Sequence, residues 1–470
     1  MMAPYPPPGR LARKWRKLRR DPVQFFADAK SPLLRTAGIW GLAALGREMP
    51  AEELLEPVTR YRTPSAAQPT PRPSAPPEEA WAVLAEERRK TVAAEPALDV
   101  VVPVYRGYED TLACLWSVLN AQGETPFELI AIDDSSPDPA LSAMLRRLAG
   151  LGLFTLHGNE RNLGFVRTAN RGMALHPHRD LVLLNADTVV YGDWLDRLRR
   201  HAGANPSAAT LTPLSNNATI CSYPVFVADN RAALELDDAE LDRLCADANP
   251  GLSVEAPTGV GFCMYIRREA LAAIGPFDAE RFGRGYGEEN DFCRRAIAHG
   301  WTNLIAGDVF VRHTGEVSFA GSAAANRQAG IRAVAGRHPD YLPAIERFIA
   351  ADPVAPLRRR IDLARLRRMA GEGAVLTVSH SRGGGVERHI RDEAAALEAG
   401  GGPATLVLRS MAERPGLVTL GPTEGAPLPN LFPLDLAAGD DDLTEILGAL
   451  PIQRIQIHSL ADYPADAVRR

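Results

Sequence analysis

The sequence predicts an α/β protein with a doubly wound, mostly parallel sheet and helices on both of its faces. Two observations support this fold class. Short apolar runs alternate with stretches whose apolar residues recur every three or four positions, which indicates strands alternating with amphipathic helices. The apolar runs are continuous, as in strands that are buried on both faces of a parallel sheet.

The elements follow one another from residue 98 onward. The first expected helix places Leu112, Leu115, Trp116 and Leu119 on one apolar stripe. The second ends at Gly150, a residue typical of helix C-termini. The expected strands are residues 98–105, 127–134, 153–159 and 180–187, and the expected helices are residues 109–122, 139–150 and 165–175. Successive strand–helix units of this kind are joined by right-handed crossovers.

Length and composition narrow the function classes. At 470 residues the chain predicts two or three domains, and its net charge of −5 gives no reason to expect a nucleic-acid partner. The five cysteines form no C-x-x-C pair, and their odd number argues against a disulfide scaffold. No apolar run approaches the roughly 18–20 residues of a membrane span, and the N-terminus lacks the apolar core of a signal peptide. We therefore expect a cytoplasmic protein in a reducing environment.

The N-terminal part divides into a basic helical segment, residues 1–60, and a Pro/Ala-rich linker, residues 61–96. Residues 10–20, RLARKWRKLRR, are open to two interpretations. They form a solvated helical face, or an interfacial helix that touches an anionic membrane through residues 10–30, with Trp15 and Phe25 at the surface. Folded structure is expected to begin near residue 97.

Acidic residues stand where predicted strands end. Asp133 and Asp134 end the second strand, and Asp187 ends a later one in the stretch LVLLNADTVV. A single aspartate after a strand is most often a cap or turn residue. In an open parallel sheet, however, ligands bind outside the carboxyl ends of the strands. Three carboxylates at that edge favour a nucleotide and a divalent cation, because Mg²⁺ and Mn²⁺ prefer carboxylate oxygens.

A glycine-rich loop precedes an acidic helix start in FGRGYGEENDFCRRAIAHGW, residues 282–301. Acidic residues in a first helical turn are favoured by the macrodipole alone. The functional interpretation is a general base presented beside a pocket. Asp291 and Arg295, four residues apart, are expected to form a positioning ion pair. His313 ends a later predicted strand, where a histidine is usually structural and sometimes a ligand.

Five segments in this order resemble the family 2 glycosyltransferases, which are inverting enzymes of the GT-A fold. The segments are VVVPVYRG, AIDDSSPD, NERNLGFVRTANRG, LLNADT and GEENDFCRRA. They look like the family's opening strand, its aspartate-containing second strand end, its N-x-G-F…N-x-G segment, its variant D-x-D motif and its E-D-x-D-x-C-x-R block. The resemblance covers roughly residues 97–320 and implies a GT-A domain at residues 97–350.

The resemblance implies a transfer of a sugar, with inversion, from a UDP-, dTDP- or GDP-sugar donor to a glycan or polysaccharide acceptor of the cell envelope. Glu289 occupies the position of the family's catalytic base, where most members have Asp, and Asp291 is the alternative base. Asp187 and His313 would hold a divalent cation, Mn²⁺ or Mg²⁺. The residues implied at the nucleotide-sugar site are Pro103, Tyr105, Asp133, Asp134, Asn162, Gly164, Arg167, Asn185 and Asp187.

The C-terminal part is expected to hold a basic helical connector, residues 351–372, and an incomplete Rossmann-like α/β segment, residues 373–470. Its run Gly383-Gly384-Gly385 stands before a predicted helix and is either a plain turn or a phosphate site. The stretch resembles the start of family 4 glycosyltransferases of the GT-B fold. That family's donor-binding half would be missing, so we expect this segment to be the non-catalytic front of a longer two-enzyme protein.

Two other functions stay open. A nucleotidyltransferase has a similar sheet and acidic metal ligands, but its usual glycine- and lysine-rich loop after the first strand is replaced here by YRGYED. A catalytically silent scaffold that binds a nucleotide or a glycan is the alternative outside the enzymes, suggested by the departures at Asn185 and Glu289.

Overall fold

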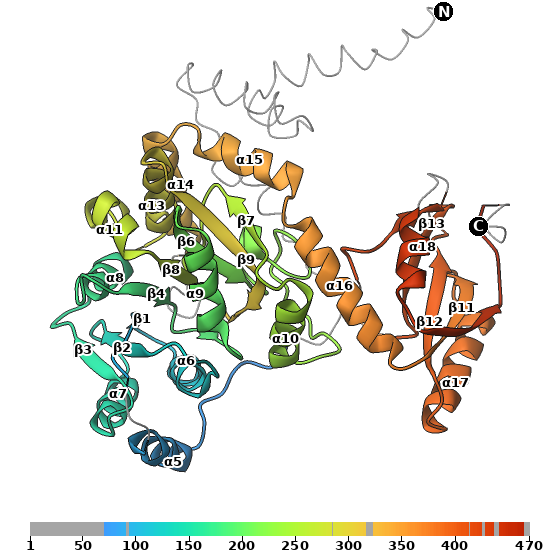
Figure 1. Ribbon diagram of the computed structural model, residues 1–470, viewed down its shortest axis with the longest axis horizontal. Helices are drawn as coiled ribbons and strands as arrows, with labels where there is room; N and C mark the ends of the chain where they lie inside the picture. Colours follow the sequence, from blue (N-terminus) through green and yellow to red (C-terminus); the bar gives the residue numbers. More distant parts are fainter. Residues whose placement is uncertain are drawn as a thin grey trace, which may run out of the picture.

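The computed structural model describes residues 70–90, 94–283, 285–315, 323–412, 414–424, 428–436 and 441–464. Within these residues an eight-stranded sheet and a C-terminal five-stranded sheet are each flanked by helices (Figure 1). This arrangement confirms the predicted α/β class. No helix in the described part of the chain is long and apolar enough to cross a membrane. The predicted membrane contact of residues 10–30 lies outside the described residues.

The large sheet is mixed, and most of its strands run in one direction. In spatial order its strands are β3 (Thr155–Gly158), β2 (Phe127–Asp133), β1 (Leu98–Val104), β4 (Asp180–Leu184), β8 (Cys263–Ile266), β6 (Ala208–Leu214), β9 (Thr302–Phe310) and β7 (Ser253–Ala256). The first four are parallel, β8 is antiparallel to β4 and β6, and β7 is antiparallel to β9. The predicted mostly parallel sheet is therefore confirmed.

Side chains of β1 show why helices cover both faces. Val100, Val102 and Val104 point into one apolar core, whereas Val101 points into the other, because successive strand residues face opposite sides. The helices on the first face are α5 (Glu78–Arg89), α6 (Tyr108–Asn120), α7 (Pro139–Gly150), α9 (Trp194–Ala204) and α10 (Asp238–Ala248). Those on the second are α8 (Phe165–Met173), α11 (Arg268–Ile274), α12 (Ala279–Phe282), α13 (Glu288–Ala298) and α14 (Ala323–Arg337). Helix α15 (Tyr341–Ala351) contributes to both cores.

Helix α5 corrects the prediction of a linker over residues 61–96 and of folded structure from residue 97. Its Trp81, Leu84 and Ala85 are buried in the first core. The Trp81 ring meets Trp116 of α6 edge-on, with ring centroids 5.0 Å apart. The apolar positions i, i+3 and i+4 form a helical stripe. They were obscured by the surrounding Pro-, Ala- and Glu-rich composition.

The C-terminal unit is built on β14 (Leu434–Asp435), β13 (Leu417–Pro422), β12 (Ala404–Ser410), β11 (Ala374–His380) and β15 (Ile452–Ile457), in that order. Strands β12, β11 and β15 are parallel, and β13 and β14 are antiparallel additions. Helices α17 (Gly385–Ala399) and α18 (Asp441–Gly448) complete it. Helix α16 (Ala355–Ala370) leads into this unit from the large sheet (Figure 1).

Candidate functional site

The carboxyl edge of the large sheet gathers the aspartates that follow its strands. Val104 pairs with Asp133 where β1 and β2 end side by side, and Asp187 follows β4, the other neighbour of β1. Because these strands are parallel, their carboxyl ends meet at one edge. The structure therefore brings together the three aspartates that the sequence placed at strand ends. Pro103 and Tyr105 lie partly exposed at the same end of β1.

Asp133 and Asp134 both organise the backbone beside them. Asp133 accepts hydrogen bonds from the amide of Ser136 at 2.8 Å and from the hydroxyl of Ser142 at 2.6 Å. Asp134 accepts bonds from the Leu163 amide at 2.7 Å and the Gly164 amide at 2.9 Å. Asp134 thereby positions the loop that contains Asn162 and begins α8. Asn162 and Arg167 are exposed beside this loop.

A short two-stranded ribbon brings Asp187 to His313. Strand β5 (Thr188–Val189) pairs antiparallel with β10 (Arg312–His313), with Thr188 opposite His313. Asp187 Oδ1 lies 3.6 Å from His313 Nε2. This pairing joins residues that are more than a hundred positions apart in the sequence, and it places the two predicted metal ligands face to face.

The orientation of His313 is set by its neighbours. Its Nδ1 lies 2.8 Å from the carbonyl oxygen of Asn217. A carbonyl oxygen only accepts, so Nδ1 bears the proton, and in the neutral ring Nε2 presents a lone pair toward Asp187. Asn216 accepts a bond from the His313 amide and donates one to its carbonyl. The ring of Phe262 stacks on the imidazole at 5.2 Å between centroids.

Asp110 joins this site without having been predicted. It stands in the first turn of α6 and is only 8% exposed. Burial, followed by the negative charge of Asp187, raises the pKa of its carboxyl. Its Oδ1 has no hydrogen-bond partner among the described residues, and neither has Oδ1 of Asn185. The sequence signal was available: YED follows the first strand, so its acidic residues reach the same sheet edge.

These donors fit a divalent cation. Oxygen and imidazole ligands suit Mn²⁺ and, for the oxygens, Mg²⁺. Ligands about 2.1 Å from a shared ion lie no more than about 4.2 Å apart, and the 3.6 Å between Asp187 and His313 is within that span. A carboxylate and an imidazole with its proton held on the far nitrogen form a suitable pair of donors.

A second acidic group lies at the opposite edge of the sheet. Asp99, Glu128 and His176 bring potential metal-ligating atoms close to one another. The Arg179 guanidinium lies between the two carboxylates, 3.1 Å from Asp99 and 2.8 Å from Glu128. Because this arginine already supplies the positive charge, the group is an ion-pair network at the amino ends of β1 and β2 rather than part of the site at the carboxyl edge.

Glu289 lies in the first turn of α13. Gly287, with φ of 97°, starts the helix in the left-handed region and donates its amide to Glu289 Oε2 at 3.2 Å. Asn290 donates its side-chain amide to Oε1 at 2.9 Å. Burial raises the pKa of Glu289 above that of an ordinary glutamate. A carboxylate of raised pKa accepts a proton more readily, which suits a general base.

One loop connects Glu289 to the Asp187–His313 pair. A Cβ placed on Gly261 would lie 3.5 Å from the Glu289 side chain. The next residue, Phe262, stacks on His313, and its carbonyl accepts a bond from the Asn185 amide at 2.8 Å. The predicted base and the predicted metal ligands therefore border the same segment, although they come from elements far apart in the sequence.

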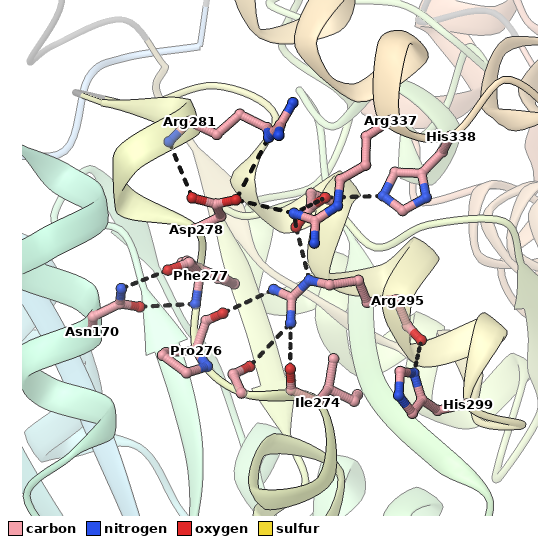
Figure 2. A network of polar contacts seen from close by, with 12 residues as sticks. Asn170, Ile274, Pro276, Phe277, Asp278, Arg281, Arg295, His299, Arg337 and His338 are labelled. Atoms are coloured by element: carbon pink, nitrogen blue, oxygen red, sulfur yellow. Dashed lines mark hydrogen bonds and ion pairs between the residues drawn. The ribbon is translucent and has the colours of Figure 1, made fainter.

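Asp291 is fully buried and paired on both oxygens. Arg295 Nε donates to Oδ2 at 2.8 Å, which confirms the predicted ion pair. On the other oxygen, His338 lies at 2.9 Å and Arg337 at 3.2 Å. Figure 2 shows Arg295, Arg337 and His338 converging from α13 and from the end of α14. This geometry favours a positioning role for Asp291 over that of a base.

The same network reaches α8. Arg295 also donates to the carbonyl of Ile274, the last residue of α11, and to that of Pro276, two residues later. The side-chain amide of Asn170 donates to the Phe277 carbonyl and accepts from the Phe277 amide (Figure 2). Arg295 of α13 and Asn170 of α8 thus both bond to the segment that follows α11, which links the two helices.

The chain is similar to two solved structures and to one family model. The structure of GalNAc-T7 with UDP, GalNAc and Mn²⁺ is 16% identical, with a TM-score of 0.40 over 64% of this chain and 69% of that one. The mannosyltransferase PcManGT from Pyrobaculum calidifontis, in complex with GDP-Man and Mn²⁺, is 14% identical, with a TM-score of 0.39 over 80% of this chain and 92% of that one. No curated protein matches the chain. Residues 99–275, which include Asp133, Asp134 and Asp187, match the model of glycosyl transferase family 2.

Proposed function

We propose that the protein transfers a sugar from a nucleotide-sugar donor to a hydroxyl group of a glycan or polysaccharide, with inversion at the anomeric carbon. One observation carries this proposal. The part of the chain that matches glycosyl transferase family 2 is the part whose sheet edge gathers Asp133, Asp134 and Asp187. A nucleotide-sugar needs recognition of its base and ribose, for which carboxylates can accept hydrogen bonds, and it needs a cation at its diphosphate, for which a carboxylate can serve as ligand.

The donor would lie along the carboxyl ends of β1, β2 and β4. Asp133 and Asp134 keep free lone pairs beside the bonds they already accept. They would accept hydrogen bonds from the ribose and the base. The exposed Arg167 would face the diphosphate, and the remaining wall would come from Pro103, Tyr105, Asn162, Gly164 and Asn185.

Asp187 and His313 would hold a divalent cation, with Asp110 and Asn185 beside them. Such an ion, when bound, offsets the negative charge of the departing nucleoside diphosphate. The protein's own contribution is to keep the His313 proton on Nδ1 and to exclude water around the ring through Phe262.

Glu289 would act as the general base. The acceptor hydroxyl oxygen forms a bond to the anomeric carbon as the bond from that carbon to the diphosphate oxygen breaks, and Glu289 takes the hydroxyl proton. One displacement inverts the configuration. The hydrogen bonds from Gly287 and Asn290 aim the carboxylate, and Asp291 holds the helix that bears it. The C-terminal unit, with its resemblance to family 4 glycosyltransferases, has no catalytic role in this proposal.

A donor screen tests the proposal. UDP-, dTDP- and GDP-sugars are incubated with the protein, with and without MnCl₂, and release of the nucleoside diphosphate is measured. We expect one donor class to be turned over only with the cation. Asp187→Ala and Glu289→Gln should lower the rate by about 10²–10⁴-fold, whereas Asp247→Ala, an exposed aspartate on α10, should leave it unchanged. Turnover of no donor, or full activity in both site variants, would exclude the proposal.

A further inference from the structure

A cavity of about 380 Å³ lies behind the candidate metal centre. Its wall includes Asn216, Phe310 and Arg312, together with the turn at residues 232–236. His313 points toward Asp187, and Arg312 precedes it on the same strand, so the Arg312 side chain points to the opposite side. We call this cavity the Arg312 pocket. Its volume is within the range of small-molecule sites, about 300–1,000 Å³.

The pocket presents a buried donor that has no acceptor. Arg312 is 9% exposed, and its Nε has no hydrogen-bond partner among the described residues. Its nearest carboxylate is that of Asp238, whose Oδ2 lies 3.7 Å from the guanidinium and accepts a 3.3 Å bond from the Tyr191 hydroxyl. Buried polar groups are normally hydrogen-bonded, and leaving one unsatisfied costs about 1–3 kcal/mol. An arginine donor and a loosely held carboxylate beside a cavity therefore indicate a ligand that both accepts and donates.

The other charged residues of the wall already have partners, and among them Asp237 caps α10 by accepting the Glu240 amide at 2.8 Å. Glu235 forms a two-pronged bond with Arg365 at 2.7 Å, and Glu240 is bonded to Arg368. The rest of the wall includes apolar surface from Leu234. This composition disfavours an anion, because several carboxylates surround the cavity. It suits a neutral ring with hydroxyl groups, since a hydroxyl accepts from Arg312 and donates to Asp238 while its C–H face packs on Leu234.

We propose that the Arg312 pocket binds one neutral saccharide unit of the glycan acceptor. This proposal rests on the proposed glycosyl transfer and names a part of its acceptor site. The link to the transfer centre is Asn216, which lines the pocket and clamps both backbone groups of His313, at 2.8 and 3.0 Å. A sugar in the pocket and a cation at Asp187 would thus lie on the two sides of one strand.

Saturation-transfer NMR with glucose, galactose, mannose, N-acetylglucosamine and rhamnose tests the pocket without any turnover. We expect at least one sugar to bind the wild type and to bind Asp187→Ala equally well, because that variant alters only the transfer centre. Arg312→Met removes the donors but keeps the aliphatic stem, and it should weaken binding at least tenfold. Leu234→Trp should also weaken binding at least tenfold, because the larger side chain fills the cavity.

The outcomes separate this proposal from the proposed function. If none of these sugars binds the wild type, or if Arg312→Met and Leu234→Trp both bind as well as the wild type, the saccharide pocket is excluded. If sugars bind in an Arg312-dependent manner while no nucleotide-sugar is turned over, the pocket stands and the transferase assignment falls. If a nucleotide-sugar is turned over but no saccharide binds, the transferase assignment stands and the saccharide pocket falls.

Discussion

His313 can be separated experimentally from the other histidine that lies in an acidic group. His313 faces Asp187 at the carboxyl edge of the sheet, and His176 lies beside Asp99 at the amino edge. If the cation binds at the carboxyl edge, His313→Ala should lower Mn²⁺ affinity at least about 10–100-fold, which is the loss caused even by removing a residue that only supports a ligand. His176→Ala is the matched control and should leave it unchanged. Electron paramagnetic resonance measures the concentration of free Mn²⁺, with UDP or GDP present, and so gives the Mn²⁺ affinity of each variant. A loss with His176→Ala alone would move the site to the amino edge.

Protonation of Glu289 should make the reaction slower at low pH. Its pKa is raised by burial, and a base works only when deprotonated. The specificity constant kcat/KM should therefore fall as the pH drops. The fall should begin at a higher pH than for an ordinary glutamate, whose pKa is about 4.3. Glu289→Gln should lower activity about 10²–10⁴-fold. Its remaining activity should no longer fall as the pH drops, so the acid limb of the pH profile disappears. Asp291→Asn, which breaks the pairs with Arg295 and His338, should lower activity without removing the limb. An unchanged profile in Glu289→Gln would exclude its role as base.

Glu288 gives a stability prediction with a defined sign. It is buried beside Glu289, one of its oxygens has no partner, and burial raises its pKa well above the usual value. A raised folded-state pKa means that this group's stabilising contribution is full below its unfolded pKa and is lost as the pH rises through the folded value. Glu288→Gln should therefore raise Tm at pH 8, by on the order of 2–4 °C, and the gain should shrink at pH 4. The exposed Glu280→Gln is the control. A lower Tm at pH 8 would contradict the argument.

At the scale of elements, the sequence predicts what local periodicity determines. The strands over residues 98–104 and 127–133 and the helix between them lie where the apolar pattern places them. The start of α7 follows from local chemistry too, because Asp138 accepts the amides of Ala140 and Leu141 ahead of the apolar stripe. The bounds of such elements depend on residues that are close in the sequence, so the local sequence pattern predicts them.

Pairings between distant segments are not predictable in the same way. Nothing in the two-residue strands β5 and β10 marks them as partners, and their pairing decides that Asp187 meets His313. The sequence places Asp110 at the same sheet edge, just after the first strand, but its position beside Asp187 depends on how α6 packs over that edge. The candidate ligands could be named from the sequence by resemblance, but their shared neighbourhood required the fold.

Helix α5 is an element whose contribution to stability can be measured. Trp81 is 1% exposed and packs on Trp116, whereas Val83, on the outer face of the same helix, is 58% exposed. Trp81→Ala should lower the free energy of unfolding by about 3–5 kcal/mol, and Val83→Ala should change it by less than about 0.5 kcal/mol. Urea unfolding followed by circular dichroism measures both. Equal, small effects would mean that α5 is not part of the first core.

At the scale of the whole molecule, α16 joins the two sheets. Ile361 of this helix belongs to the core of the large sheet, and Leu366, little more than one turn later, belongs to the core of the C-terminal unit. Between them lies Arg365, whose side chain is fully buried. One helix is thus shared by two apolar cores, which predicts that the two units resist separation.

A buried polar network reinforces the junction. Arg365 lies 3.2 Å from Asp362 on the same helix and bonds to Glu235 of the large unit at 2.7 Å. Asp362 accepts the Tyr223 hydroxyl at 2.6 Å and the amide of Asn430, from the C-terminal unit, at 2.9 Å. Every member is hydrogen-bonded, so removal of one partner leaves a buried charge uncompensated, at a cost of about 3–5 kcal/mol.

Arg365→Met should therefore uncouple the two units. The methionine keeps much of the aliphatic volume but leaves the Asp362 and Glu235 carboxylates without their cation. We expect the wild type to unfold in one calorimetric transition and the variant to show a second transition at lower temperature, from the C-terminal sheet. Arg367→Met, at an exposed position of the same helix, is the control and should behave as the wild type. Adding Asp362→Asn to Arg365→Met should restore part of the loss, because it removes the buried charge. A single unshifted transition in Arg365→Met would show that the apolar contacts of Ile361 and Leu366 alone hold the units together.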